Sequence, residues 1–116
     1  MHIGAVTGTH NIAIGTNSGD DLLAGSNNVM MGMESGRNIN TGTANTCIGH
    51  NSGASITTTS ENTYLGNLAG GSGQSGNNVG IGSKALGSGG HGSYSVAMGW
   101  SAGEDLTGTQ TTLIGG

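Results

Sequence analysis

One series of glycines constrains the fold of this 116-residue chain more than any other feature. The glycines follow one another at intervals of 17, 17, 17, 16, 17 and 16 residues, and an aliphatic residue precedes each of them. We call them the register glycines: Gly15, Gly32, Gly49, Gly66, Gly82, Gly99 and Gly115. A fixed period of this length predicts coils stacked one on the next. We therefore expect residues 1–116 to form a single repeat array of about seven coils.

The three residues before each register glycine are expected to form a short β-strand. The first strand residue is always β-branched: Ile12, Val29, Thr46, Thr63, Val79, Val96 and Thr112. The third is always aliphatic: Ile14, Met31, Ile48, Leu65, Ile81, Met98 and Ile114. This alternation predicts a strand whose first and third residues share a buried face. The central residue of the strand varies widely in size, with glycine at position 80 and tyrosine at position 64, so we expect its side chain to point outward.

A second aliphatic residue follows the register glycine by seven positions in four of six repeats. These residues are Leu22, Ile39, Ile56 and Leu106, whereas Gly73 and Gly89 occupy the place in the other two repeats. The pattern predicts a second strand, and hence an all-β solenoid or β-roll whose coils read strand, turn, strand, turn. Glycines between the strands can adopt the positive φ that tight corners require.

Asparagine precedes the strand in five repeats, at Asn11, Asn28, Asn45, Asn62 and Asn78. Stacked coils would place these residues above one another. Two interpretations stay open: the side-chain amides hydrogen-bond along the array, or asparagine only favours the turn before the strand.

The composition excludes several classes of function. Aromatic residues make up 3% of the chain, and neither Phe nor Pro occurs, so little material is available for the core of a compact enzyme. The formal net charge is −4, and Lys84 and Arg37 are the only basic residues besides histidine, which disfavours a nucleic-acid partner. No apolar stretch is long enough to predict direct membrane insertion. Cys47 is the only cysteine, so no intramolecular disulfide can form.

Each coil offers few inward apolar side chains, which suggests that one chain is not enough. Burial of each contributes about 1.5–3 kcal/mol, whereas ordering the backbone costs about 1–2 kcal/mol for every residue. We therefore expect a homotrimer with a shared core. The expected core residues are Ile12, Ile14, Val29, Met31, Ile48, Leu65, Val79, Ile81, Val96, Met98 and Ile114.

The repeated word Asn-Val/Thr-x-Ile/Met-Gly-x-x-Ser/Ala-Gly resembles the head repeats of YadA-type trimeric autotransporter adhesins, repeats also found in bacteriophage tail fibres. The resemblance runs from Asn11 to Gly115. It implies a trimeric, left-handed parallel β-roll, with the first and third strand residues turned toward the threefold axis, and attachment to a surface. Periods of 16 to 17 residues with Thr-Gly-Thr turns are closer to the phage repeats. The array stops in mid-repeat without a neck or stalk motif, so we expect a segment of a longer fibre.

Short segments that match catalytic or cofactor-binding motifs are explained by the repeat itself. The segment Gly99-Trp-Ser101-Ala-Gly103 matches a nucleophile elbow, and residues 80–85 match part of a dinucleotide fingerprint, but their glycines belong to the repeat. Cys47 and His50 could supply a thiolate nucleophile or part of a metal site. The four histidines, His2, His10, His50 and His91, occupy different phases of the repeat. We expect no catalytic, cofactor or metal site, and no enzyme.

The expected function is host attachment as a structural segment of a trimeric phage tail fibre. Its partners would be other fibre or virion proteins and a host-surface glycan or protein, and its location the virion. Tyr64, Tyr94 and Trp100 avoid the expected inward positions, so they are candidate receptor contacts, although they could instead cover a neighbouring strand. One alternative is a head repeat of a bacterial surface adhesin. Another is a single-chain ice-binding solenoid, which would use Thr7/Thr9, Thr41/Thr43 and Thr107/Thr109.

Overall fold

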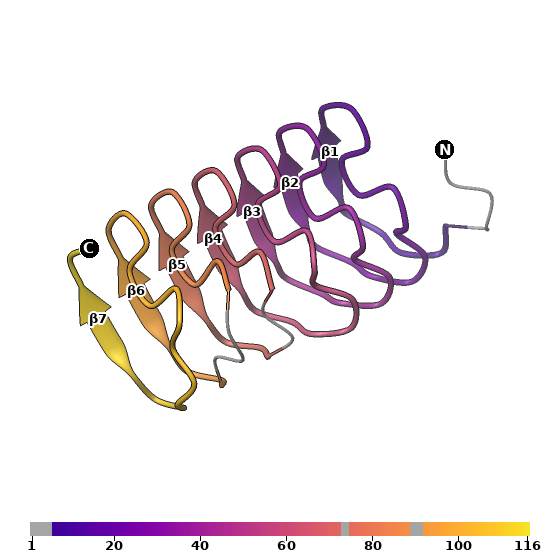
Figure 1. Ribbon diagram of the computed structural model, residues 1–116. Coiled ribbons are helices and arrows are strands. Elements are labelled where there is room, and N and C mark those ends of the chain that lie inside the picture. The colour runs from indigo at the N-terminus through magenta and orange to yellow at the C-terminus, as the bar shows by residue number, and fades with distance from the viewer. Residues whose placement is uncertain (1–5, 73–74, 89–91) are drawn as a thin grey trace.

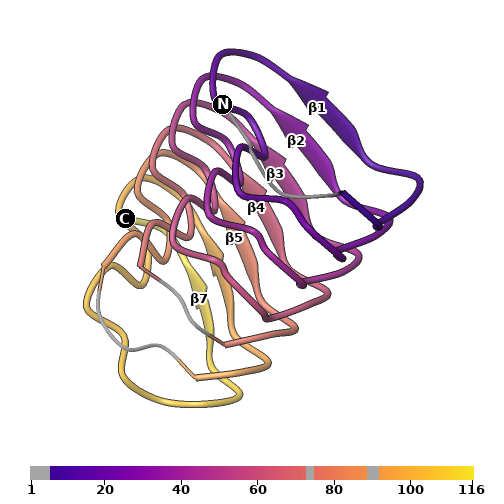
Figure 2. The same ribbon diagram turned by 90° about the vertical axis from the view of Figure 1, so that its right-hand side faces the viewer.

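The computed structural model describes residues 6–72, 75–88 and 92–116 as a single parallel β-solenoid of about six turns (Figure 1). One sheet contains seven strands in chain order, each parallel to its neighbours. The strands are β1 (Ile12–Ile14), β2 (Val29–Met31), β3 (Thr46–Ile48), β4 (Thr63–Leu65), β5 (Val79–Ile81), β6 (Val96–Met98) and β7 (Thr112–Ile114). They coincide with the predicted strand positions. The coils stack into a short rod of 39 × 22 × 19 Å, and the described residues contain no helix (Figure 2).

The prediction of a second strand in each coil is wrong. Leu22 and Ile39 are buried, but the segments around them are turns and bends. Asn17 and Gly19 adopt positive φ values of 55° and 61°, and the Leu22 N–H donates to the Gly19 carbonyl over 3.2 Å. These conformations curl the chain too tightly for an extended strand. Backbone bonds between coils nevertheless continue here, as from the Leu23 N–H to the Asn40 carbonyl (3.0 Å). Gly73 and Gly89 lie outside the described residues.

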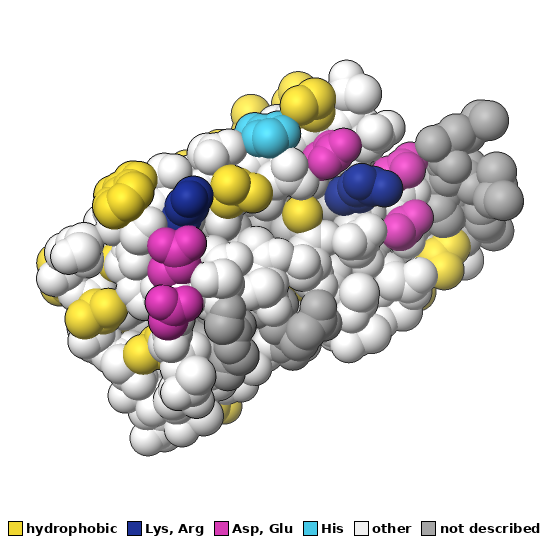
Figure 3. Space-filling view, in the orientation of Figure 1, with side chains coloured by type: hydrophobic (Ala, Val, Ile, Leu, Met, Phe, Trp, Pro, Cys, Tyr) yellow, Lys and Arg dark blue, Asp and Glu magenta, His cyan; other side chains and the backbone are white. Residues whose placement is uncertain are grey.

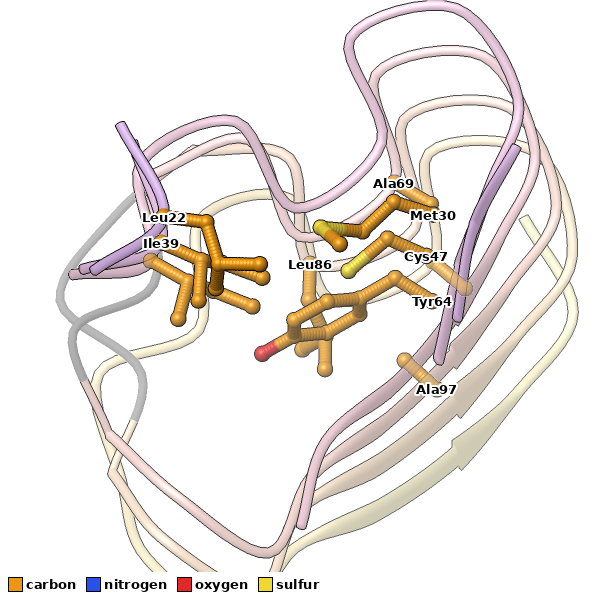
Figure 4. Packing of buried hydrophobic residues seen from close by; sticks show 10 residues of the cluster. Leu22, Met30, Ile39, Cys47, Tyr64, Ala69, Leu86 and Ala97 are labelled. Atoms are coloured by element: carbon orange, nitrogen blue, oxygen red, sulfur yellow. The ribbon is translucent and has the colours of Figure 1, made fainter. Parts of the chain in front are cut away.

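The central strand residue points into the coil, so its predicted outward orientation is wrong. Met30, Cys47, Tyr64 and Ala97 are all fully buried. Figure 4 shows these side chains reaching from the strands toward Leu22 and Ile39 on the opposite wall, with Leu86 among them. The interior of a coil is narrow, and the one central side chain of each strand fills it from the wall that the sheet forms.

Variation at the central position is compensated between neighbouring coils. A Cβ added at Gly80 would lie 3.1 Å from Tyr64 Cδ1, and one at Gly70 would lie 2.4 Å from the same ring. The Tyr64 ring therefore uses space that a side chain at either position would need. Leu86 is fully buried at φ 51°, where most other coils carry a glycine. The interior is filled by differently sized residues that fit one another across coils.

The asparagines form a buried ladder, which confirms the first of the two interpretations. The backbone N–H of Asn45 donates to Asn28 Oδ1 over 2.9 Å, and the N–H of Asn62 donates to Asn45 Oδ1 over 3.1 Å. Asn45 Nδ2 also donates to Asn28 Oδ1 (3.1 Å) and to the Thr59 carbonyl (2.9 Å). The ladder continues through Asn78 to the backbone N–H of Ser95, which donates to Asn78 Oδ1 over 2.9 Å. The side-chain amides of Asn28, Asn45 and Asn62 thus join their own coils to both neighbouring coils.

Candidate interaction surface

The most extensive candidate surface is the outer face of the sheet, which consists of the first and third residues of strands β1 to β7. All fourteen of these residues are aliphatic, methionine or threonine, and none is charged. The expected trimer-core residues lie here, on the side of the sheet that faces away from the coil interior. Ile14 is 56% exposed, Leu65 43% and Ile114 76%. The same chain therefore covers one face of the sheet and leaves the other uncovered.

Exposure varies along this face. The exposed residues are Ile12, Ile14, Met31, Leu65, Met98, Thr112 and Ile114, and the half-buried ones are Val29, Thr46, Ile48, Thr63, Val79, Ile81 and Val96. Parallel in-register pairing aligns equivalent residues into two rows, spaced by about 4.8 Å from strand to strand. A continuous apolar strip of this kind is uncommon on a free monomer and is typical of an interaction surface.

The three candidate receptor contacts divide into one buried and two exposed residues. Tyr64 is fully buried, so its assignment as a surface contact is wrong. Its hydroxyl donates to Asn62 Oδ1 over 3.4 Å, and burial raises its pKa above the ordinary value. Tyr94 and Trp100 are 61% and 68% exposed, and they lie just before and just after β6. Tyr94 adopts a φ of 63°, which is uncommon for a bulky side chain.

Charged groups are few on the face that Figure 3 shows, and acidic side chains predominate over basic ones. Its basic side chains lie beside acidic ones, and Arg37 Nη1 lies 3.7 Å from Glu34 Oε1. This pairing leaves no cluster of basic groups there.

The structure separates the residues of the candidate nucleophile. Cys47 points into the interior, where burial raises the pKa of its thiol to about 12. His50 lies in an exposed turn, where its ring nitrogens bond Asn51 Nδ2 at 3.1 Å and Asn67 Nδ2 at 2.9 Å. The thiol is therefore protonated at neutral pH and shielded from the imidazole.

Other candidate groups are also dispersed. Ser101 Oγ is buried without a hydrogen-bond partner in the described part of the chain. His2 and His91 lie outside that part. Within the described ranges, no three His, Cys, Asp or Glu side chains are grouped in a way that could hold a metal ion. The same ranges contain no helix of the length and hydropathy that crossing a membrane requires.

The threonine pairs of the ice-binding alternative lie in irregular segments and bends between the strands. Thr7, Thr9 and Thr41 are exposed, whereas Thr43 is half-buried and its hydroxyl donates to Ser60 Oγ over 3.1 Å. Ala24 interrupts the row between Thr7 and Thr41. These hydroxyls therefore form a less regular surface than the outer face of the sheet.

Comparisons of the chain with protein-family models, with curated proteins and with solved structures found no match.

Sequence reasoning missed one exposed apolar residue close to the outer face. Met33 follows the register glycine Gly32 and is 51% exposed, in the same position of the repeat as Trp100. The sequence signal was available, because polar residues such as Thr16 and Asn67 occupy that position in other coils. Met33 and Trp100 extend the apolar surface of their coils beyond the strand.

Proposed function

We propose that this chain is a structural and host-attachment segment of a homotrimeric phage tail fibre. In this role it is a rigid spacer with a receptor-contacting surface, and it is not an enzyme. The uncovered apolar face of the sheet is the observation that carries the proposal. The resemblance of the repeat to phage-fibre and adhesin repeats supports a virion location over other uses of a solenoid.

A homotrimer is supported by the chemistry of the outer face. The face has no charge, runs the length of the array and exposes large side chains such as Ile14 and Leu65. A second and a third copy present rows with the same spacing, so apolar side chains can pack at every level. Burial of this face stabilises the assembly by about 25 cal/mol for each Å² of apolar surface removed from water.

Sedimentation equilibrium and native mass spectrometry of the 116-residue chain test the trimer. We expect a mass of three chains over a range of concentrations. A well-folded monomer at high concentration would contradict the proposal.

Tyr94 and Trp100 support a receptor contact. Both rings are largely exposed, so they can stack on the apolar faces of sugars. In a trimer each ring is present in three copies, and simultaneous binding strengthens a weak contact with a glycan-covered cell.

Adsorption of assembled fibres to host cells tests this contact. We expect Trp100→Ala and Tyr94→Ala to reduce adsorption several-fold while the trimer is retained. Met33→Ala is the matched control, because it removes an exposed apolar side chain from the position that Trp100 occupies in another coil. If both aromatic variants adsorb as the parent does, this segment is a spacer only.

A further inference from the structure

Two threonine hydroxyls lie in the middle of the outer face, and the third threonine of that face, Thr112, lies in the last strand, β7. Thr46 and Thr63 are the first residues of β3 and β4, and they are directly paired in the sheet. Val29 and Val79 occupy the same position on the strands to either side. Both threonines are half-buried, and neither hydroxyl has a hydrogen-bond partner among the described residues. Association of copies through this face would remove these hydroxyls from water, and any hydroxyl left without a hydrogen-bond partner would weaken the association.

We propose that Thr46 and Thr63 set the axial register in which copies of this chain associate. The inference rests on the proposed trimer and specifies how its copies are aligned. Equivalent coils of the three copies lie at the same height along the axis. In that alignment the Thr46 hydroxyls meet at one level and the Thr63 hydroxyls at the next. A hydroxyl both donates and accepts, so three of them close a ring in which each is satisfied.

A shift by one coil breaks this pairing. It places Thr46 of one copy opposite Val29 of another, and Thr63 of that second copy opposite Val79 of the first. One contact between Thr63 and Thr46 remains between these two levels, so the shift leaves a hydroxyl buried without a partner at each end of the threonine pair. Apart from Thr46, Thr63 and Thr112, the first residue of each strand is valine or isoleucine, and the third is always isoleucine, leucine or methionine. The aliphatic rows therefore favour association but barely distinguish one register from the next. A polar residue at one level of an apolar interface is a known means of specifying register.

The test compares the parent chain with Thr46→Val/Thr63→Val, a near-isosteric change that removes only the hydroxyls. Ile48→Cys and Leu65→Cys are each introduced separately into the parent and into the double valine variant. For each background, the two cysteine-bearing chains are mixed, assembled into oligomers and oxidised. A disulfide requires Cα atoms about 4.4–6.8 Å apart, so links between like positions report the level alignment. A link from position 48 to position 65 reports a shift of one coil, because Ile48 and Leu65 are paired neighbours within the chain.

Cleavage after Glu61 separates the two cysteine positions, and mass spectrometry then identifies the linked peptides. Cys47 is buried in the coil interior and stays out of the reaction. We expect the parent to give links between like positions only, and the double valine variant to show a several-fold rise in links from 48 to 65. Thr58→Val is the matched control, because it removes an exposed hydroxyl from a turn of the same coil as Thr46, away from the outer face. It should leave the pattern unchanged.

Two results would overturn the inference while leaving the trimer intact: frequent links from 48 to 65 in the parent, or their continued absence in the double variant. A parent that sediments as a monomer and forms no link between chains would instead refute the proposed trimer, and the register role with it.

Discussion

The register glycines satisfy two separate requirements of the backbone at the scale of single residues. Their φ values lie between 107° and 135°, in a region that essentially only glycine adopts. They also stack closely, because a Cβ added at Gly49 would lie 2.6 Å from the carbonyl oxygen of Gly66. The same contact recurs from Gly15 to Gly82. Conformation and close approach together explain the glycine from Gly15 to Gly99, whereas at Gly115 only the conformation applies.

Gly49→Ala is expected to destabilise the array more than Gly115→Ala. Both substitutions impose backbone strain of about 1–3 kcal/mol. Only Gly49→Ala also forces two coils apart, since nothing lies within 4 Å of a Cβ at Gly115. Thermal denaturation followed by circular dichroism gives the two midpoints. Equal losses would show that strain alone explains the glycine and that the stacking contact is unimportant.

Burial of Cys47 predicts a loss of stability at alkaline pH. The folded pKa is raised by desolvation from 9.0 to about 12, so the unfolded chain releases this proton first. The stabilisation is complete below pH 9 and declines between pH 9 and 12, by about 1.4 kcal/mol for each pH unit. Cys47→Ala should remove this part of the pH dependence, as measured by denaturation at a series of pH values. A wild-type and a variant curve of the same shape would contradict the burial of the thiol.

At the scale of the coil, a short strand is held by polar groups at its start and by glycine at its end. A residue with positive φ precedes each ladder position, as Ala44 does at 56° before Asn45. This turn directs the asparagine side chain inward, where it bonds the next coil. The Ser35 hydroxyl similarly donates to the Cys47 carbonyl over 2.6 Å. Polar side chains thus provide much of the connection between coils that a larger core would provide in another fold.

Asn45→Ala is expected to cost about 1–3 kcal/mol or more, because it leaves the buried N–H of Asn62 without its acceptor. It also removes the bonds from Asn45 Nδ2 to Asn28 and Thr59. Asn67→Ala is the matched control, since Asn67 is exposed and bonds His50 at the surface. Urea denaturation of both variants measures the difference. A small loss for Asn45→Ala, equal to that of the control, would mean that the ladder contributes little to stability.

The sequence predicted the strand before each register glycine and left the ladder as one of two interpretations, but the direction that it predicted for the strand side chains is wrong. Period-two alternation shows that Thr46 and Ile48 share one face and that Cys47 lies on the other. It does not show which face is inside, because in this solenoid both faces are apolar. Leu22 and Ile39 were expected to lie in a second strand, but their turn conformation depends on positive φ at residues such as Asn17, which the aliphatic pattern does not encode. Tyr64 and Cys47 are both central strand residues, so the same ambiguity between the two faces explains why the outward orientation predicted for each is wrong.

At the scale of the whole molecule, two apolar layers lie on opposite sides of one sheet. The inner layer, with Met30, Ile56 and Tyr64, is completed within one chain. The outer layer, with Ile14, Ile48 and Leu65, is left open by that chain. The uncovered outer layer, and not a thin interior, is therefore the feature that favours a trimer. Folding of the coil and association of copies depend on different residues.

Substitution of one isoleucine from each layer separates these two processes. Ile56→Asp places a carboxylate in the closed interior, where an unpaired charge is prohibitively costly, so the chain should fail to fold. Ile48→Asp places the same group on the outer face, where water reaches it in the single chain but not in an assembly. That variant should retain the circular dichroism of the parent and sediment as a monomer. If both variants unfold alike, the coil depends on its partners for folding; if Ile48→Asp still forms trimers, the outer face of the sheet is not the interface.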